Sequence, residues 1–280
     1  MNVIKHLRRG ISRVTRLRTA RNVDIQQERA HILSGKSDFY TKEAYKTLRT
    51  NIAFSLAVEG CKAIAVTSAM ASEGKSITAL NLAISFGEAG QRVLLIDGDL
   101  RRPNQARLLE MKSRPGLSNA LIKRSDLERE VRQTAYPGLE VLLCGDIPPN
   151  PSELLGSARM EELLNGLKER YDYIFIDTPP VNVVADASIL TKYVDGVLFV
   201  VRQGESEKDS VLTAVSQLEF ANAKLLGFIL NGVRMEGSGR YGYGRYKKYK
   251  KYRKYSRYGQ YGYGYGYGHD REPEEPERAR

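Results

Sequence analysis

Short runs of hydrophobic residues recur along the chain and alternate with longer segments of helical periodicity. The runs are rich in β-branched residues and predict buried strands. They cover residues 62–68, 92–97, 139–144, 171–177, 196–202 and 224–231. Because strands that are apolar throughout and alternate with helices form parallel sheets, we expect an α/β fold. Its mostly parallel central sheet should carry helices on both faces.

Four further segments have the periodicity of amphipathic helices. Residues 76–88 repeat apolar side chains every three or four positions, and helices are also predicted near 150–169 and 206–221. A helix over 40–56 is predicted with Thr41 as its N-cap. Its apolar positions are Tyr45, Leu48, Ile52, Phe54 and Leu56.

The net charge of +11 is concentrated at the two ends of the 280-residue chain. Residues 1–30 carry +6 and residues 237–280 carry +7, whereas residues 31–236 carry −2. This distribution argues against a domain whose whole surface binds nucleic acid, although basic ends could contact phosphates, membranes or acidic proteins. We therefore divide the chain into a basic N-terminal arm (1–35), a globular domain (36–236) and a disordered tail (237–280).

Cysteine content and hydropathy limit the cellular setting. Two cysteines, Cys61 and Cys144, cannot build a disulfide framework, which agrees with a reducing cytoplasm. No apolar run approaches the roughly 18–20 residues that are needed to span a bilayer. The basic N-terminus lacks the apolar region of a secretory signal. We therefore expect a cytoplasmic protein.

A phosphate-binding loop is predicted between the first strand and the helix that follows it. A loop in this position can hold phosphates with its backbone N–H groups, which makes the fold P-loop NTPase-like. Lys75 would reach the β- and γ-phosphates of ATP, and Ser76 would ligate Mg²⁺. The first glycine of the usual pattern is replaced by Ala69, and an alanine can stand there only if its φ is negative. The alternative interpretation of the segment is an exposed turn before a helix. The predicted nucleotide-binding residues are Ala69, Met70, Ala71, Ser72, Glu73, Gly74, Lys75, Ser76 and Ile77.

Carboxylates follow two other predicted strands at the point where each strand ends. Asp97 ends the run at 92–97 and Asp99 follows two residues later, while Asp177 ends the run at 171–177. Because ligands of parallel sheets bind at the carboxyl ends of strands, we expect these loops to meet the phosphate-binding loop. Carboxylates at buried strand ends are costly unless they face a cation, and Mg²⁺–ATP would supply one. The alternative is that each aspartate only caps a turn.

The motifs resemble those of the bacterial tyrosine kinases, the autophosphorylating enzymes of capsule and exopolysaccharide synthesis. The resemblance covers about residues 38–235 and includes the segments at 94–103, 145–155 and 176–181 together with the pair Asp186-Ala187. It implies that Ser76, Asp99 and Asp177 hold Mg²⁺ and that Lys75, Asp97 and Asp99 are catalytic. Asp97 or Asp99 would be the base, and the resemblance favours Asp97. It also implies self-association through Glu43, Lys46 and Arg49, with Lys46 in place of the usual arginine.

The family resemblance carries expectations about partners and location. Sister families of partitioning ATPases and metal-cluster carriers usually have a signature lysine near the start of the phosphate-binding loop. This chain has Met70 at that position, which argues against membership of those families. The length resembles the split form of these kinases, in which a transmembrane activator of the polysaccharide chain-length type supplies a cytoplasmic segment. The resemblance implies a homo-oligomer, a cognate tyrosine phosphatase, protein substrates in polysaccharide synthesis and a place at the inner membrane face. Nucleic acid is not expected as a partner.

A tyrosine cluster dominates residues 237–269, which contain nine basic residues and no acidic one. Each phosphate would add about −1.5 to −2 charges, so about five phosphates would cancel the basic charge. Binding of nucleic acid or anionic lipid, and an inert linker, are the alternative readings. The predicted autophosphorylation sites are Tyr241, Tyr243, Tyr246, Tyr249, Tyr252, Tyr255, Tyr258, Tyr261, Tyr263, Tyr265 and Tyr267.

The function predicted from the sequence is an ATP-dependent protein tyrosine autokinase that phosphorylates its own tail in trans. Arg101 and Arg102 are predicted to contact phosphate or a neighbouring subunit, the alternative being surface arginines in a loop. The rival function is a nucleotide-switched scaffold ATPase whose basic tail binds membrane or nucleic acid.

Overall fold

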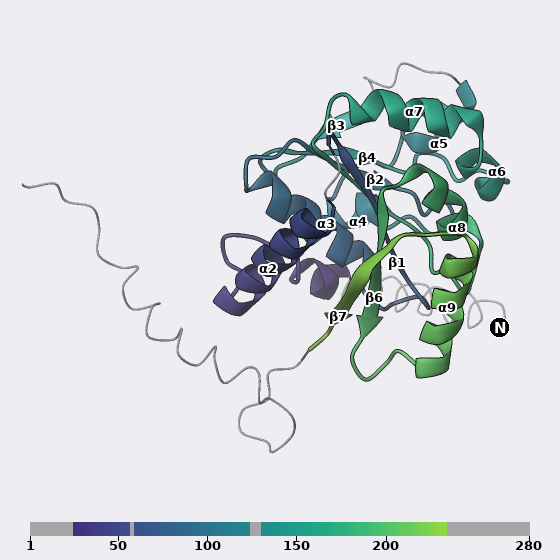
Figure 1. Cartoon of the computed structure of the whole chain (residues 1–280). Coiled ribbons are helices and arrows are strands. Elements are labelled where there is room, and N and C mark those ends of the chain that lie inside the picture. Colours follow the sequence, from purple (N-terminus) through teal and green to yellow (C-terminus); the bar gives the residue numbers. More distant parts are fainter. Residues whose placement is uncertain (1–24, 57–58, 124–129, 234–280) are drawn as a thin grey trace, which may run out of the picture. The chain divides into compact units, whose positions relative to one another are not determined.

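In the residues that the computed structural model describes (25–56, 59–123 and 130–233), seven strands form one sheet. Its order is β3-β4-β2-β5-β1-β6-β7 (Figure 1). Every neighbouring pair is parallel except β3 and β4, which are antiparallel. The strands are β1 (Lys62–Ser68), β2 (Val93–Asp97), β3 (Val131–Gln133), β4 (Leu139–Leu142), β5 (Tyr173–Asp177), β6 (Gly196–Arg202) and β7 (Leu225–Asn231).

Helices cover both faces of the sheet (Figure 1). One face packs against α2, α3 and α4, and the other packs against helices α5 to α9. The helices are α2 (Phe39–Ser55), α3 (Lys75–Gly87), α4 (Gln105–Leu108), α5 (Leu117–Lys123), α6 (Pro151–Leu155), α7 (Ala158–Lys168), α8 (Asp186–Leu190) and α9 (Lys208–Phe220), with a 3₁₀ turn η2 (Thr191–Tyr193). The expected α/β class is confirmed.

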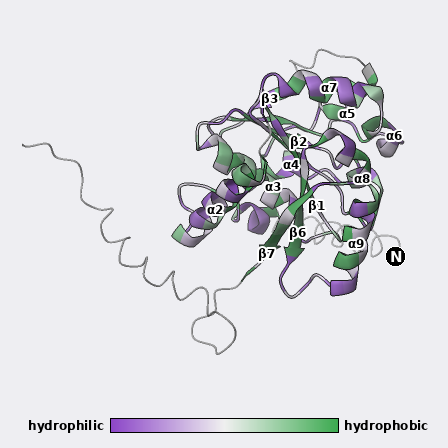
Figure 2. Ribbon diagram, viewed as in Figure 1, coloured by the Kyte–Doolittle hydropathy of each residue, from purple (hydrophilic) through white to green (hydrophobic). Residues whose placement is uncertain are grey.

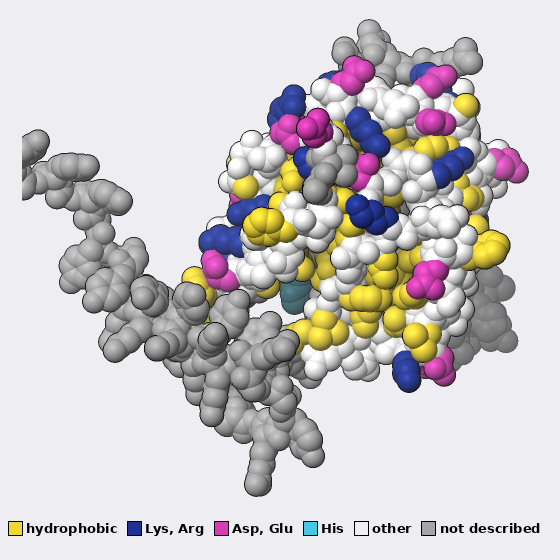
Figure 3. Space-filling view, in the orientation of Figure 1, with side chains coloured by type: hydrophobic (Ala, Val, Ile, Leu, Met, Phe, Trp, Pro, Cys, Tyr) yellow, Lys and Arg dark blue, Asp and Glu magenta, His cyan; other side chains and the backbone are white. Residues whose placement is uncertain are grey.

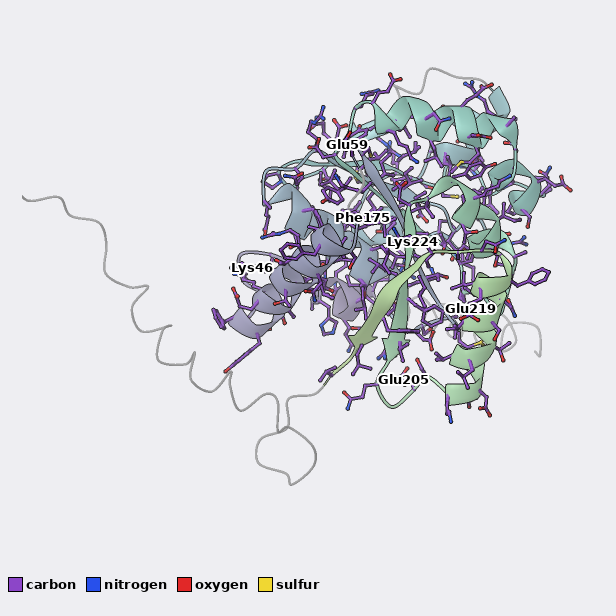
Figure 4. All side chains as sticks on the ribbon, in the orientation of Figure 1. Lys46, Glu59, Phe175, Glu205, Glu219 and Lys224 are labelled. Carbon is purple, nitrogen blue, oxygen red and sulfur yellow. The ribbon has the colours of Figure 1, made fainter. Side chains whose placement is uncertain are left out.

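The core lies between the sheet and its helical layers, and the strands are the most hydrophobic part of the fold (Figure 2). Every residue of β2 and of β5 is buried, as expected for strands with neighbours and helices on all sides. Aromatic rings fill the α3 side of the sheet, where the ring centroids of Phe86 and Tyr173 are 4.3 Å apart and Phe175 is fully buried (Figure 4). This packed centre includes β5, whose last residue, Asp177, belongs to the candidate site.

Most of the predicted elements are confirmed, and the differences have local causes. All six predicted strands are present, but β3 was not predicted because it is a three-residue strand with two polar residues. The helix predicted near 150–169 is two helices, α6 and α7, separated at Gly156 and Ser157. The prediction of Thr41 as N-cap was wrong, because Asp38 caps α2 and accepts a hydrogen bond from the Thr41 backbone N–H at 3.0 Å.

Part of the segment assigned to the basic arm packs on the domain. Ile32 and Leu33 are buried in the core cluster formed by α2, α3 and the sheet. Asn81 of α3 holds this segment, since its side-chain oxygen accepts from the Leu33 N–H at 2.7 Å and its amide donates to the His31 carbonyl at 2.9 Å. Asn81 also donates to the hydroxyl of Tyr45 in α2. The rest of the arm, residues 1–24, lies outside the described residues, and the three-part division of the chain stays a prediction.

Strand β7 forms one edge of the sheet and is less covered than the other parallel strands. Its side chains Phe228 and Leu230 are exposed, and Figure 3 shows hydrophobic surface on the face of the domain that carries this strand. The strand ends at Asn231, beside the phosphate-binding loop. The tyrosine cluster follows in sequence and lies outside the described residues.

Candidate active site

The sheet brings the three predicted site loops to one edge. In the sheet order, β5 lies between β2 and β1, and Asp97 is paired in register with Asp177. The loop after β1 follows Ser68, two residues beyond the position that pairs with Asp177. Because the three strands are parallel, their carboxyl ends open on the same side. The prediction that these loops lie close together is confirmed.

Lys75 is the cation at the centre of the site. It is the first residue of α3, and its Nζ lies 3.2 Å from Asp99 Oδ2 and 3.4 Å from Asp177 Oδ1. Burial alone would lower the pKa of Lys75, but the negative charges of Asp177 and Asp99 outweigh it and raise that pKa. The ammonium is therefore fully charged at physiological pH and faces two carboxylates from different loops.

Asp97 and Asp177 are completely buried, and burial raises the pKa of both carboxyls. The pKa of Asp97 is also raised by the charge of Asp177. Asp97 Oδ2 accepts from the Gln105 backbone N–H at 3.0 Å, while Asp97 Oδ1 is buried without a hydrogen-bond partner. In Asp99, by contrast, Oδ2 faces Lys75 and Oδ1 accepts the backbone N–H groups of Arg101 and Arg102. Of the carboxylate oxygens of Asp97 and Asp99, Asp97 Oδ1 is therefore the one without a hydrogen-bond partner.

Gln105 is a site residue that the sequence did not reveal. Its side-chain amide donates to Asp177 Oδ2 at 2.9 Å and to the Ser76 carbonyl at 3.0 Å. Its backbone N–H donates to Asp97, so this one residue joins all three site loops. Nothing local in the sequence marks a glutamine at the start of a four-residue helix, because its partners are 8, 29 and 72 residues away.

The phosphate-binding loop has a backbone that suits its predicted role. Gly74 has φ of +91° at the N-cap of α3, a conformation that glycine adopts without strain. Among the described residues, the non-glycine positions with positive φ are Ser72, Glu110 and Asn222. Ala69 is thus outside the left-handed region, which is the condition that an alanine at this place requires.

The ends of β6 and β7 hold the outer side of this loop. Arg202 Nη1 donates to the Ser72 carbonyl at 2.9 Å, and Asn231 Nδ2 donates to the Glu73 carbonyl at 3.0 Å. The Glu73 carboxylate is buried, accepts from the Met70 N–H at 2.9 Å and accepts the hydroxyl of Ser206. The end of β6, the turn at Ser206 and the end of β7 are therefore all hydrogen-bonded to this loop. Only the loop itself was predicted from the sequence.

The residues predicted for self-association behave in two ways on α2. Lys46 and Glu43 form an ion pair at 2.7 Å in which Lys46 is exposed and Glu43 is partly exposed, with Lys46 on the helix surface in Figure 4. Arg49 instead donates to the backbone carbonyl and the hydroxyl of Ser85 in α3. Glu43 and Lys46 are available to another subunit, whereas Arg49 already has partners within the chain.

The acidic residues of the site fit Mg²⁺ bound together with a nucleotide. No group of three or more His, Cys, Asp or Glu side chains within the described ranges forms a ready-made metal site. Mg²⁺ commonly keeps several waters and uses one or two carboxylates plus substrate phosphates, so such a closed group is not required. The site has more negative than positive charge, because the carboxylates of Asp99 and Asp177 share one ammonium, that of Lys75. In addition, Asp97 Oδ1 is buried without a hydrogen-bond partner. Both features suit a site that binds a further cation.

Comparison with known proteins identifies the family. Residues 61–219 match the family model described as AAA domain. Tyrosine-protein kinase YwqD of Bacillus subtilis (strain 168) is 42% identical over 201 residues, which cover 72% of this chain and 85% of that protein. The kinase domain of Escherichia coli tyrosine kinase ETK has 35% identity and a TM-score of 0.68, over 73% of this chain and 80% of that one. The chimerical protein CapA2B2 has 37% identity and a TM-score of 0.67, over 71% and 86% respectively.

These similarities define an α/β P-loop enzyme with tyrosine kinase relatives. The chain belongs to the bacterial tyrosine kinase family, the autokinases of capsule and exopolysaccharide systems, and is a protein-tyrosine kinase. Tyrosine-protein kinase CpsD of Streptococcus agalactiae is a further relative, 38% identical over 74% of this chain and 90% of that protein. Within the part of the chain that is described, no helix is both long and apolar enough to cross a membrane.

Proposed function

We propose that this kinase transfers the γ-phosphoryl group of ATP to tyrosines of its own tail, in trans. The observation that supports this most directly is the meeting of Lys75, Asp99 and Asp177 at one strand-end site in a P-loop fold. The tail contributes eleven tyrosines at Tyr241–Tyr267, a density that suits repeated modification. A segment of this composition, which cannot bury a core, can present a hydroxyl to the site of a neighbouring copy.

Binding of ATP is assigned to the loop 69–77 and to Lys75. The backbone N–H groups of the loop and the N-terminus of α3 would hold the phosphates. Lys75 now faces two carboxylates, and the β- and γ-phosphates would present more negative charge to the same ammonium. We infer that Lys75 moves from its carboxylate partners toward the phosphates when ATP binds.

Mg²⁺ is assigned to Ser76, Asp99 and Asp177. The Ser76 hydroxyl lies 3.2 Å from Lys75 Nζ, so it stands beside the same carboxylates. When bound, the ion would neutralise charge on the transferring phosphoryl group. Gln105 would hold the Asp177 carboxylate in place through its 2.9 Å hydrogen bond.

Asp97 is assigned as the base. The tyrosine oxygen would attack the γ-phosphorus, the bond from that phosphorus to the β–γ bridging oxygen would break, and the phenolic proton would pass to Asp97 Oδ1. ADP would leave with the bridging oxygen. Burial raises the pKa of Asp97, which brings it closer to that of a useful proton acceptor at neutral pH. Asp99 is the alternative base, but both of its oxygens already have partners.

The partners follow from the family and are proposals for this chain. A transmembrane activator of the polysaccharide chain-length type would recruit the kinase to the inner membrane face. The fold's similarity to the chimerical protein CapA2B2 supports this idea. Phosphorylation would replace the tail's basic charge with negative charge, and would release the tail from acidic surfaces and weaken head-to-tail assembly. A cognate phosphatase would restore the basic state, and proteins of polysaccharide synthesis would be further substrates.

A mixing experiment tests phosphorylation in trans. One chain carries Lys75→Met with an intact tail, and the other keeps the wild-type site but has phenylalanine at all eleven tail tyrosines. With Mg²⁺–ATP, and with the cytoplasmic segment of the activator where required, we expect phosphotyrosine on the Lys75→Met chain only when both are present. Label on wild type but never on this mixture would show action in cis. Phosphate release without phosphotyrosine in wild type would contradict the proposed transfer.

A further inference from the structure

Arg101 is held by a buried carboxylate from a distant part of the chain. Its Nε donates to Asp186 Oδ2 at 2.8 Å and its Nη2 donates to Asp186 Oδ1 at 3.1 Å, so the guanidinium is bound at two points. Asp186 is completely buried in the first turn of α8. The hydrogen bonds to Asp186 raise the pKa of Arg101 above its ordinary value. A buried carboxylate needs such a partner, because an unpaired one is costly.

Ser152 completes the arrangement from a third segment. Its hydroxyl donates to Asp186 Oδ1 at 2.6 Å and accepts from Arg101 Nη2 at 2.9 Å. The three side chains thus form a closed ring of hydrogen bonds that joins the loop after β2 to α6 and α8. The partners are 34, 51 and 85 residues apart in sequence. Arg101 belongs to the loop that carries Asp97 and Asp99, and none of the side-chain hydrogen bonds described for the ring goes to residues 69–77.

The backbone of the same arginine sets the position of Asp99. Asp99 Oδ1 accepts the N–H of Arg101 at 3.3 Å and the N–H of Arg102 at 2.9 Å. The other oxygen, Oδ2, faces Lys75 at 3.2 Å. Because the Arg101 side chain is fixed at two points, the backbone of the loop is restricted, and its N–H groups have a defined position toward Asp99. The orientation of Asp99 therefore depends on where the Arg101 side chain is anchored.

We propose that Asp186 is a positioning residue for phosphoryl transfer, which acts through Arg101 to hold the Asp99 carboxylate in its metal-binding orientation. This inference rests on the proposed role of Asp99. It differs from a purely structural role, because it predicts a specific effect on Mg²⁺ dependence. The inference also gives the two arginines of the loop different roles. The Arg101 side chain is bound to Asp186, whereas among the described contacts Arg102 contributes only its backbone N–H.

The test measures autophosphorylation rates at saturating ATP while free Mg²⁺ is varied, and it also measures Mg²⁺ binding by isothermal titration with a non-hydrolysable ATP analogue, where Asp186→Asn and Arg101→Lys should each bind Mg²⁺ about fivefold more weakly. For both variants, we expect kcat to fall about tenfold and the Mg²⁺ concentration for half-maximal rate to rise about fivefold. The KM for ATP should stay within twofold, because the Arg101 guanidinium is bound to Asp186 and Ser152, and the phosphate contact predicted for Arg101 from the sequence is therefore not expected. The double variant should have the same kcat and Mg²⁺ dependence as either single variant, because both substitutions break the same contact between Arg101 and Asp186. Ser152→Ala removes one member and leaves the two-point pair, so a two- to threefold effect is expected.

Controls separate this inference from the proposed site. Arg159→Lys alters an exposed arginine–carboxylate pair on α7 and should behave as wild type. Melting temperatures identify any variant that fails to fold, in which case Ser152→Ala and Arg101→Lys decide. Wild-type kcat and Mg²⁺ dependence in folded variants, or additive losses in the double variant, would overturn the inference. Full activity in Asp99→Asn would instead refute the assigned role of Asp99.

Discussion

Lys75 and Asp99 form a nearly buried ion pair, with 3.2 Å between Lys75 Nζ and Asp99 Oδ2. Asp177 shares the same ammonium at 3.4 Å, and Asp97 adds a further buried carboxylate from the adjacent strand end. One lysine therefore balances the negative charge of two loops. Because such a pair is costly to break on one side, its loss should affect both stability and chemistry.

Replacing Lys75 by methionine tests this charge balance. We expect at least a hundredfold loss of phosphotyrosine formation and a loss of about 3–5 kcal/mol of unfolding free energy at pH 8. The loss of stability should be smaller at pH 5, because without Lys75 the pKa values of Asp97 and Asp177 rise further and protonated carboxyls need no cation. Urea unfolding at both pH values measures the effect. Lys46→Met, in an exposed pair, should change stability by less than about 0.5 kcal/mol at either pH.

Asp97→Asn should stabilise the protein while it removes activity. Asp97 is buried and its Oδ1 has no partner, so a neutral side chain of the same shape should add about 1–2 kcal/mol at pH 8. Folding raises the pKa of Asp97, so the ionised carboxylate destabilises the folded state. This destabilisation is complete above the pKa of the folded state and disappears below the pKa of the unfolded state, about 3.9. The gain should therefore shrink as the pH falls toward 4.

Thermal unfolding across this pH range measures the gain for Asp97→Asn. A variant less stable than wild type at pH 8 would show that the carboxylate is better accommodated than its buried oxygen indicates. Retained kinase activity would exclude Asp97 as the base and leave Asp99 as the remaining candidate.

The sequence predicted the strand-end chemistry but not the contacts that hold it. Asp97 and Asp177 could be placed together, because the rule for parallel sheets needs only the ends of two apolar runs. Gln105 and Asp186 could not be assigned roles, since each acts through partners as distant as 72 and 85 residues, respectively, and no local pattern encodes such a contact. The cap of α2 was misplaced by three positions because Asp38 and Thr41 are both good capping residues.

Gly74→Ala should disrupt the phosphate-binding loop. An added Cβ would lie 2.0 Å from Asn231 Nδ2, and an L-residue at φ of +91° is itself strained. We expect ATP affinity to fall at least a hundredfold and stability to fall by about 2–3 kcal/mol, from backbone strain of about 1–2 kcal/mol and loss of the Asn231 hydrogen bond. Isothermal titration with Mg²⁺–ATP and urea unfolding measure both quantities.

Gly90→Ala is the matched control for the glycine of the loop. It has φ of +84° but nothing within 4 Å of the added Cβ, so it carries the backbone strain without the clash. It should lose about 1–2 kcal/mol and keep wild-type ATP affinity. Equal ATP affinity in the two variants would mean that contact with Asn231 does not shape the nucleotide site.

The α2 residues can separate self-association from folding. Glu43 and Lys46 pair only with each other at the surface, so Glu43→Ala and Lys46→Ala should each change stability by less than about 0.5 kcal/mol. If these residues contact another subunit, both variants should shift the kinase from oligomer to monomer in sedimentation velocity. Arg49→Ala should do the same and also lose about 1–2 kcal/mol, because Arg49 donates to Ser85 within the chain. An oligomer that survives both exposed substitutions would place the interface elsewhere, and Arg49 would then be a residue of the fold rather than of the assembly.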